Sequence, residues 1–233
     1  MAQKKLQRFA AIKTFANVLE YPENMRGQWG AFFKNTNPVV LELACGRGEY
    51  TVGLSKLFPE KNFIGVDIKG NRLYVGAKKC LDQQLTNAAF VRTQIAMLPQ
   101  YFAAGEISEI WITFPDPQLR TSKAKKRLTH PQFLRLYQQV LSTGGLLHLK
   151  TDSPKLYGFT KKVIELYKLI VVEDNDDVYA GDAAEELKIK THYEALDIAQ
   201  SRKIYYLKFK LPSIIADIDE QLQEELQITE KNQ

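Results

Sequence analysis

The chain reads Glu42-Leu43-Ala44-Cys45-Gly46-Arg47-Gly48 between a short apolar run and a stretch with helical spacing. Gly46 and Gly48 allow the backbone to turn tightly and to approach a ligand closely. Open α/β sheets bind ligands beyond the carboxyl ends of their strands, which is where such a turn would lie. The sequence therefore predicts a ligand-binding turn between a strand and a helix.

Apolar runs alternate with helix-period stretches from Pro38 onward, which indicates a mostly parallel sheet with helices on both faces. The candidate strands are Val39 to Leu43, Asn62 to Asp67, Ala88 to Arg92, Ile107 to Phe114 and Gly145 to Lys150. A strand candidate from Ile204 to Leu211 would add an antiparallel pair with the apolar run that ends at Val172. We expect a doubly wound, Rossmann-like α/β fold with an antiparallel C-terminal strand.

An acidic residue, Asp67, follows the glycine turn by about twenty positions, at the end of the next strand candidate. Its carboxylate could accept hydrogen bonds from both ribose hydroxyls of a nucleoside, or it could cap the following helix. Thr51 replaces the third glycine of a dinucleotide-binding turn, which disfavours pyrophosphate cofactors. Glu42 suits a cationic amino group. This chemistry matches S-adenosylmethionine, which has an ammonium, a sulfonium and a ribose.

Charge is unevenly distributed along the chain, whose formal net charge is +5. Residues 213–233 carry a formal charge of −5, which leaves +10 on the rest. Such a surplus favours a polyanionic partner through counterion release, although a basic surface kept for solubility would look the same.

Three segments follow from these patterns. Residues 1–37 are expected to form a basic N-terminal appendage, because Gly27, Gly30 and Pro38 interrupt regular structure. Residues 38–212 would form an S-adenosylmethionine-dependent methyltransferase domain. Residues 213–233 would form an acidic amphipathic helix that packs on the domain or on a partner. Its apolar stripe consists of Ile214, Ile215, Ile218, Leu222 and Leu226.

Two prolines enclose an aspartate after the fourth strand candidate, in Phe114-Pro115-Asp116-Pro117. The proline rings stiffen the backbone and would hold the Asp116 carboxylate at the ligand edge of the sheet. Asp116 is therefore the catalytic candidate. A basic run follows that would hold phosphates beside the reacting centre, although such runs are usually solvated loops. It consists of Arg120, Lys123, Lys125, Lys126 and Arg127.

The cysteines and the apolar runs of the sequence indicate the cellular compartment and whether a metal or membrane segment is expected. The two cysteines, Cys45 and Cys80, support neither a disulfide framework nor a thiolate metal site, so we expect a reducing cytoplasm. No cluster of histidine, cysteine and carboxylate has metal-ligand spacing, and we predict no metal. No apolar run approaches membrane-spanning length, so we predict no membrane insertion.

Four motifs together resemble the bacterial tRNA (guanine-N7)-methyltransferase family. They are the glycine turn after Glu42, the Asp116-Pro117 turn with its basic sequel, Lys150-Thr151-Asp152, and Thr191-His192-Tyr193-Glu194. Their order and spacing agree with that family over about residues 38 to 210. The resemblance implies a class I enzyme that transfers a methyl group from S-adenosylmethionine to N7 of a guanine in tRNA. We expect a monomer or a homodimer.

The resemblance also assigns roles to the motif residues. Glu42, Asp67 and Asp116 would contact the donor or the catalytic centre, together with Gly46 and Gly48 of the turn. Arg120, Asp152, Thr191 and Glu194 would bind the guanine region of the tRNA. Turn or helix capping is the alternative role of Asp152 and Thr191.

Two departures from the family bear on the site. Gln94 stands where the family tends to have an acid near the adenine of the donor, and its amide can still hydrogen-bond the adenine amino group. Gln118 and Leu119 stand where a tryptophan and a proline usually follow the Asp-Pro turn.

Two other functions remain alternatives. A proline-flanked aspartate after the fourth strand also resembles amino-methyltransferase motifs, so the acceptor could be another RNA base or an amine. A non-catalytic RNA-binding module with a decayed donor site is the other alternative.

Overall fold

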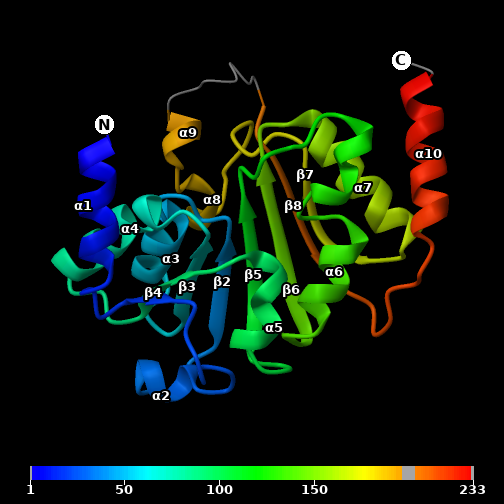
Figure 1. Ribbon diagram of the computed structural model, residues 1–233. Helices are drawn as coiled ribbons and strands as arrows, with labels where there is room; N and C mark the ends of the chain where they lie inside the picture. The colour runs from blue at the N-terminus through cyan, green and yellow to red at the C-terminus, as the bar shows by residue number, and fades with distance from the viewer. Residues whose placement is uncertain (1, 196–202, 232–233) are drawn as a thin grey trace.

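A central β-sheet organises the computed structural model, which describes residues 2–195 and 203–231 (Figure 1). Its strands are β1 (Val18–Glu20), β2 (Val39–Leu43), β3 (Asn62–Asp67), β4 (Ala88–Arg92), β5 (Ile107–Thr113), β6 (Leu141–Thr151), β7 (Ile170–Asn175) and β8 (Tyr205–Lys210). In the described chain these eight strands lie in the order β1-β4-β3-β2-β5-β6-β8-β7. Neighbours from β1 to β6 pair in parallel, whereas β8 pairs antiparallel with both β6 and β7.

The predicted fold class is confirmed by this topology, including the antiparallel pair at the C-terminal side. Strands β2, β3 and β4 begin and end at the predicted residues. Strand β6 begins at Leu141, earlier than the predicted Gly145. Two glycines in its first half obscure the apolar pattern there, since glycine has no side chain to pack.

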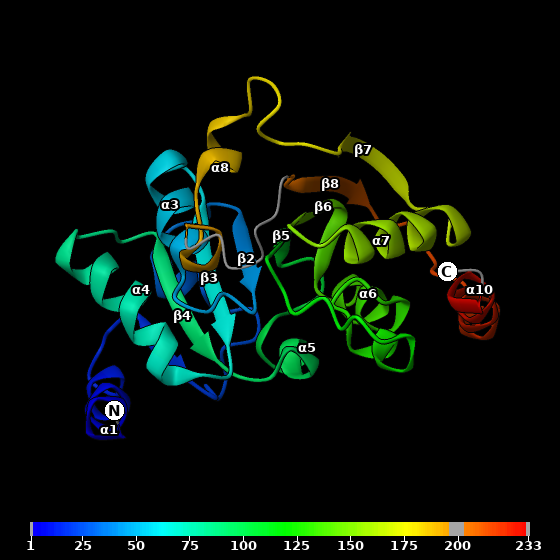
Figure 2. The ribbon, with the colours of Figure 1, turned by 90° about the horizontal axis from the view of Figure 1, so that it is seen from above.

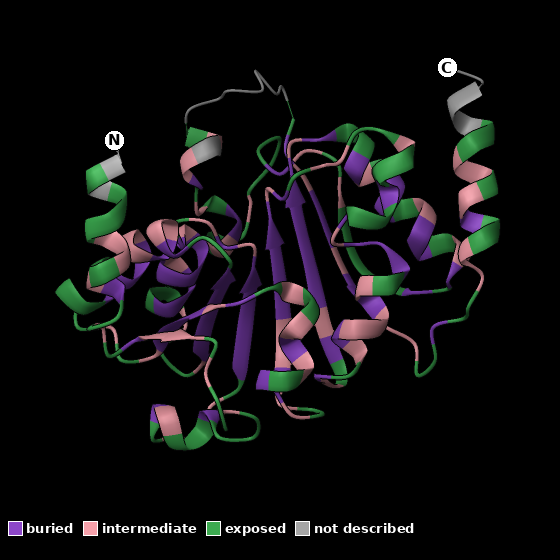
Figure 3. Cartoon of the chain, in the orientation of Figure 1, coloured by how far each residue is buried: buried purple, intermediate pink, exposed green. Residues whose placement is uncertain are grey.

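Helices cover both faces of the sheet, as the view from above shows (Figure 2). One face carries α3 (Glu49–Leu57), α4 (Gly70–Asp82) and α8 (Glu185–Lys188). The other face carries α5 (Leu98–Tyr101), α6 (Pro131–Gln138) and α7 (Pro154–Leu166). On β2, Leu41 and Leu43 belong to the core under α6 and α7, whereas Val40 packs with Tyr50 of α3. Alternate residues thus enter different cores, and the central strands are buried along much of their length (Figure 3).

The N-terminal segment, expected to be an appendage, contributes to the same sheet. Strand β1 pairs in parallel with β4, and α1 (Ala2–Ile12) lies beside α4. Trp29 of α2 (Trp29–Phe33) is fully buried, and its indole Nε1 donates to the carbonyl oxygen of Tyr101 at 2.9 Å. A strand of three residues is too short to show a period in the sequence, which is why β1 was not predicted.

The C-terminal helix α10 (Asp219–Lys231) begins later than the apolar stripe predicts. Ile214 precedes the helix and is 80% exposed, whereas Ile215 and Leu222 are buried against the domain. The guanidinium of Arg135 on α6 donates to the carbonyl oxygen of Ala216 at 2.9 Å and to the Asp219 carboxylate at 2.6 Å. These bonds tie the chain before the helix to α6, and the buried Leu222 packs the helix on its own domain.

Both thiols of the chain, Cys45 and Cys80, are buried, and neither forms a disulfide. No helix in residues 2–195 and 203–231 combines the length and apolar character needed to cross a bilayer. The same part of the chain brings together no group of three or more His, Cys, Asp or Glu side chains that could hold a metal ion.

Candidate active site

A cavity of about 270 Å³ opens at the carboxyl end of the sheet, between the turns after β2, β3 and β5. Strands β2 and β5 are neighbours although β3 and β4 come between them in the chain, so the connections change direction here. Open α/β sheets bind ligands at such a point. The walls of this carboxyl-end cavity include Gly46, Asp67, Thr113, Asp116 and Thr191. Four predicted site residues, all of these except Thr113, thus meet around one space.

The glycine turn depends on left-handed backbone conformations. Gly46 has φ +57° and Gly48 has φ +72°, and Ala44 just before them has φ 54°. A Cβ at Gly48 would overlap the Phe90 ring, with Cζ at 2.9 Å, whereas a Cβ at Gly46 would meet nothing within 4 Å. Gly48 therefore allows close packing beneath the turn, and Gly46 leaves open space beside it.

Asp67 ties the turn to the end of β3. Its Oδ2 accepts from the amide nitrogen of Gly46 at 2.9 Å, and its Oδ1 accepts from that of Lys69 at 2.8 Å. The cap residue of α4 is Lys69, so Asp67 does not cap that helix as the alternative proposed. A carboxylate has about four lone-pair sites, so each oxygen can accept a further bond from a ligand in the cavity.

Glu42 is buried beneath the turn and joins two elements. Its Oε2 accepts from the amide nitrogen and the hydroxyl of Thr51, at 2.7 and 2.5 Å, and its Oε1 accepts from the Thr113 hydroxyl at 3.0 Å. Burial raises the pKa of Glu42 to about 7, although these hydrogen bonds act in the opposite direction. Its carboxylate is directed to these threonines, and its contact with the amino group of a donor stays a prediction.

The loop after β5 holds Asp116 through a strained backbone. Phe114 and Gln118 have φ 46° and 47°, which non-glycine residues adopt at a cost of about 1–3 kcal/mol each. Asp116 is exposed at the cavity, and its Oδ1 accepts from the amide nitrogen of Gln118 at 3.0 Å. Such strain is typical of functional loops, which supports the choice of this aspartate.

Thr191 and Glu194 form a capping box at the start of α9 (His192–Ala195). The Thr191 hydroxyl accepts from the amide nitrogen of Glu194 at 3.1 Å, and the Glu194 carboxylate accepts from that of Thr191 at 3.3 Å. Thr191 therefore caps the helix, as the alternative role considered for it predicts, and it also lines the cavity. The carboxylate of Glu194 is directed to the buried ammonium of Lys150, 3.0 Å away.

The other predicted residues lie outside the described cavity walls. Gln94 and Arg120 are exposed and precede the short 3₁₀ helices η1 (Ile95–Met97) and η2 (Thr121–Lys126). Asp152 follows β6 and is half-buried. The cap residue of α7 is Ser153, whose hydroxyl accepts from the amide nitrogen of Leu156 at 3.2 Å. The capping role considered for Asp152 therefore belongs to its neighbour.

Sequence reasoning missed the roles of three residues at this site. Thr51 and Thr113 satisfy the buried carboxylate of Glu42. Lys150 is fully buried and links Glu194 to the sheet. The one signal for Lys150 was a cation at the end of an apolar strand, where a buried charge requires a partner.

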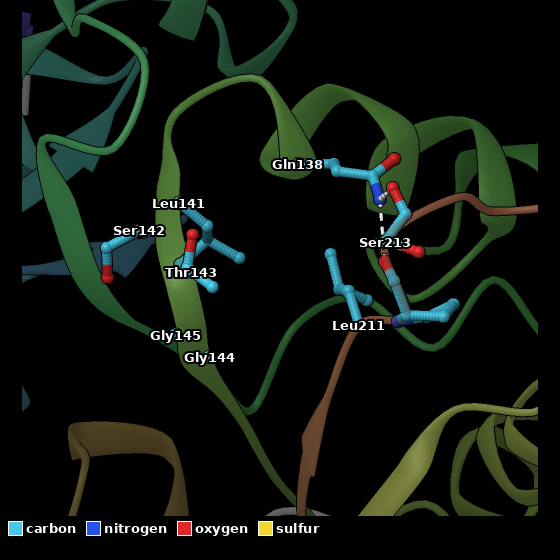
Figure 4. Close-up of a pocket in the computed structure, with 9 residues that line it drawn as sticks. Gln138, Leu141, Ser142, Thr143, Gly144, Gly145, Leu211 and Ser213 are labelled. Atoms are coloured by element: carbon cyan, nitrogen blue, oxygen red, sulfur yellow. Dashed lines mark hydrogen bonds between the residues drawn. The ribbon is translucent and has the colours of Figure 1, made fainter.

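A second cavity, of about 330 Å³, lies at the opposite end of β6 (Figure 4). It is lined by the Ser142 to Gly145 stretch and by the Leu211 to Ser213 stretch, with Gln138 between them. The Gln138 amide donates to the carbonyl oxygens of Pro212 and Ser213 at 2.8 and 2.9 Å. None of its described lining residues is ionisable. Of these two cavities, the one at the carboxyl end of the sheet has the charged side chains.

Comparison with known proteins agrees with this geometry. A family model described as "Putative methyltransferase" matches residues 36–207. The tRNA (guanine-N(7)-)-methyltransferase of Porphyromonas gingivalis is 51% identical, over 86% of this chain and 86% of the relative. That of Bacteroides thetaiotaomicron is 46% identical, over 91% of this chain and 87% of the relative. The solved 16S rRNA methyltransferase KamB shares the fold, with TM-score 0.61 and 14% identity over 80% of this chain and 94% of that chain. From these extended identities, the chain belongs to the tRNA (guanine-N(7)-)-methyltransferase family.

Proposed function

We propose that the protein transfers a methyl group from S-adenosylmethionine to N7 of a guanine in tRNA. The supporting observation is the single cavity that brings the glycine turn and Asp67 together with Asp116 and Thr191. The named relatives at 46–51% identity support tRNA as the acceptor. We also propose a reducing cytoplasmic location, in which the buried thiols of Cys45 and Cys80 persist.

The glycine-turn side of the cavity fits a nucleoside donor. Asp67 keeps lone pairs for ribose hydroxyls, and the space beside Gly46 allows a ligand to approach the backbone. When bound, S-adenosylmethionine supplies an electrophilic methyl group on a sulfonium. A cationic amino group of the donor above Glu42 would favour the ionised form of this carboxyl, and Gln94 would hydrogen-bond the adenine.

The Asp116 side of the cavity would position the base. Guanine N7 has a free lone pair, so no residue needs to remove a proton before in-line attack on the methyl carbon. Asp116 and Asp152 would orient the exocyclic amino edge and stabilise the positive charge that develops on the ring. Thr191 would add a neutral hydrogen bond and Glu194 would hold Thr191 in place, while Arg120 would bind phosphate.

The test is methylation of unmodified tRNA transcripts by the purified protein, with 7-methylguanosine mapped by nucleoside mass spectrometry. A matched transcript that contains 7-deazaguanosine lacks the N7 lone pair and should take no label. Label in the 7-deaza transcript would move the acceptor to another base atom, and label on protein would move it to an amine. Absence of S-adenosylhomocysteine binding in calorimetry would favour the non-catalytic module.

Asp116→Asn tests the catalytic assignment. Asparagine keeps the Oδ1 acceptor for the amide nitrogen of Gln118, so the loop should keep its shape while the charge is lost. We expect the methylation rate to fall roughly 100-fold to 1,000-fold, with unchanged thermal unfolding. Asp82→Asn, on the exposed side of α4, is the control and should keep the full rate. A full rate in Asp116→Asn would remove Asp116 from the reaction.

A further inference from the structure

The ammonium of Lys150 lies fully buried near the carboxyl end of β6 and joins distant parts of the chain. Its Nζ donates to the two carboxylate oxygens of Glu194 at 3.0 and 3.2 Å and to the Tyr179 hydroxyl at 3.1 Å. It also donates to the carbonyl oxygens of Leu187 and Ile189, at 2.8 and 3.2 Å. These acceptors belong to one segment, which runs from Tyr179 through α8 to α9.

Aromatic rings enclose this ion pair. The ring centroids of Tyr50, Phe114 and Tyr179 lie 5.5, 5.4 and 5.3 Å from Nζ. The Tyr179 hydroxyl also hydrogen-bonds the Glu194 carboxylate. In such a water-excluded place, a charge that loses its partner is strongly destabilised, so the pair constrains the segment that carries Glu194.

The backbone of Lys150 contacts the other wall of the carboxyl-end cavity. Its carbonyl oxygen accepts from the amide nitrogen of Phe114 at 2.8 Å, and it pairs in register with Thr113 of β5. Thr113, Phe114 and Thr191 line the cavity, whereas Lys150 is not among the lining residues. One residue thus fixes the Asp116 loop through its main chain and the Thr191 segment through its side chain.

We propose that Lys150 is a positioning residue of the active site, which sets the distance between the Thr191 segment and the Asp116 loop and so shapes the cavity for its ligands. The identity of those ligands rests on the proposed function. The position of the Thr191 segment relative to the Asp116 loop is independent of the proposed function, because it follows from the bonds of Lys150 to Glu194 and Phe114.

Lys150→Met tests this role, because methionine keeps an apolar chain and removes the ammonium. We expect the affinity for S-adenosylhomocysteine, measured by calorimetry, to fall at least about tenfold, since small displacements of a site cost much binding and rate. Amide hydrogens of residues 185–195 should exchange faster with deuterium. Lys61→Met is the matched control, because it removes a 2.7 Å ion pair with Glu109 near the amino ends of β3 and β5. It should leave both measurements unchanged.

Two further variants keep the test decisive if Lys150→Met does not fold. Tyr179→Phe removes one hydroxyl from a residue that is 42% exposed, and should speed exchange over 185–195 with about threefold weaker binding. Glu194→Gln removes the charge that pairs with Lys150 and should also speed exchange over 185–195. Where Lys150→Met folds, the double variant with Glu194→Gln should lose less affinity than the product of the separate losses.

Wild-type affinity and exchange in both Lys150→Met and Tyr179→Phe would overturn the proposal. It would also be overturned if the affinity loss of the double variant equalled the product of the losses of Lys150→Met and Glu194→Gln. If Lys150→Met is unfolded, wild-type exchange in both Tyr179→Phe and Glu194→Gln would overturn it instead. A wild-type protein that leaves tRNA unmethylated would overturn the proposed function, while the exchange measurement would still decide the role of Lys150.

Discussion

The two walls of the carboxyl-end cavity are held in place by different means. The glycine-turn wall depends on backbone conformation, since Gly46 and Gly48 are left-handed and Asp67 accepts two main-chain N–H groups. On the opposite wall, strained local backbone holds the Asp116 loop, whereas the Thr191 segment depends on a side-chain contact between Lys150 and Glu194, 44 positions apart. Substitutions in the first wall should therefore act through conformation and stability. Substitutions in the second should act mainly through turnover.

Gly48→Ala should damage the glycine-turn wall most, and Gly46→Ala is its matched comparison. Both positions have positive φ, so an alanine at either is strained by about 1–2 kcal/mol. Only the Cβ at Gly48 would also overlap the Phe90 ring, which overpacks the core at a further cost of roughly 1–3 kcal/mol. We expect the free energy of unfolding in urea to fall by about 3 kcal/mol or more for Gly48→Ala and by about 1 kcal/mol for Gly46→Ala. Equal losses would show that backbone strain alone sets this wall.

Glu42→Gln tests a group that lies beneath both walls, because its oxygens accept from Thr51 and Thr113. Burial raises the pKa of Glu42 from 4.5 to about 7, so the folded protein holds a proton that the unfolded chain loses between these values. The stability contributed by this proton is full below pH 4.5, falls as the pH rises and is lost above about pH 7. A pKa shift of one unit corresponds to about 1.4 kcal/mol, so the free energy of unfolding should be about 3 kcal/mol lower above pH 7 than below pH 4.5 on account of this group.

The glutamine should remove this pH dependence, because an amide does not ionise in this range. It should also fit the site, since its NH₂ can donate to Thr113 while its oxygen accepts from Thr51. Urea unfolding between pH 5 and 8 measures the slope, and Glu60→Gln, at an exposed position, should keep it. Parallel slopes for Glu42→Gln and the wild type would mean that Glu42 is ionised in the folded protein throughout this range.

The glycine-turn wall could be predicted from sequence because its determinants are local. The apolar run of β2, the two glycines and the spacing to Asp67 each have a direct structural cause, and the structure places them as expected. The Asp116 loop could be predicted for the same reason, since two prolines adjoin the aspartate.

One contact of the opposite wall, between Lys150 and Glu194, could not be predicted, because it joins residues far apart in sequence. Thr191 and Glu194 match both a family motif and the capping-box spacing, and the structure forms the capping box. Lys150 reaches Glu194 across 44 positions of sequence, and no local period encodes that contact. A short apolar strand with a terminal lysine does not show where its ammonium will find a carboxylate.

Asp152 and Ser153 give the smallest expected effects and separate two roles at adjacent positions. Ser153→Ala removes the hydroxyl that accepts from the amide nitrogen of Leu156, which should lower the free energy of unfolding by about 1 kcal/mol and keep the methylation rate. Asp152→Asn leaves that cap intact, so stability should hold while single-turnover methylation of tRNA falls about tenfold through loss of a charge near the base. If Asp152→Asn instead lowers stability and keeps the rate, Asp152 belongs to the turn before α7. Of the two aspartates, Asp116 would then be the one whose charge stabilises the methylated base.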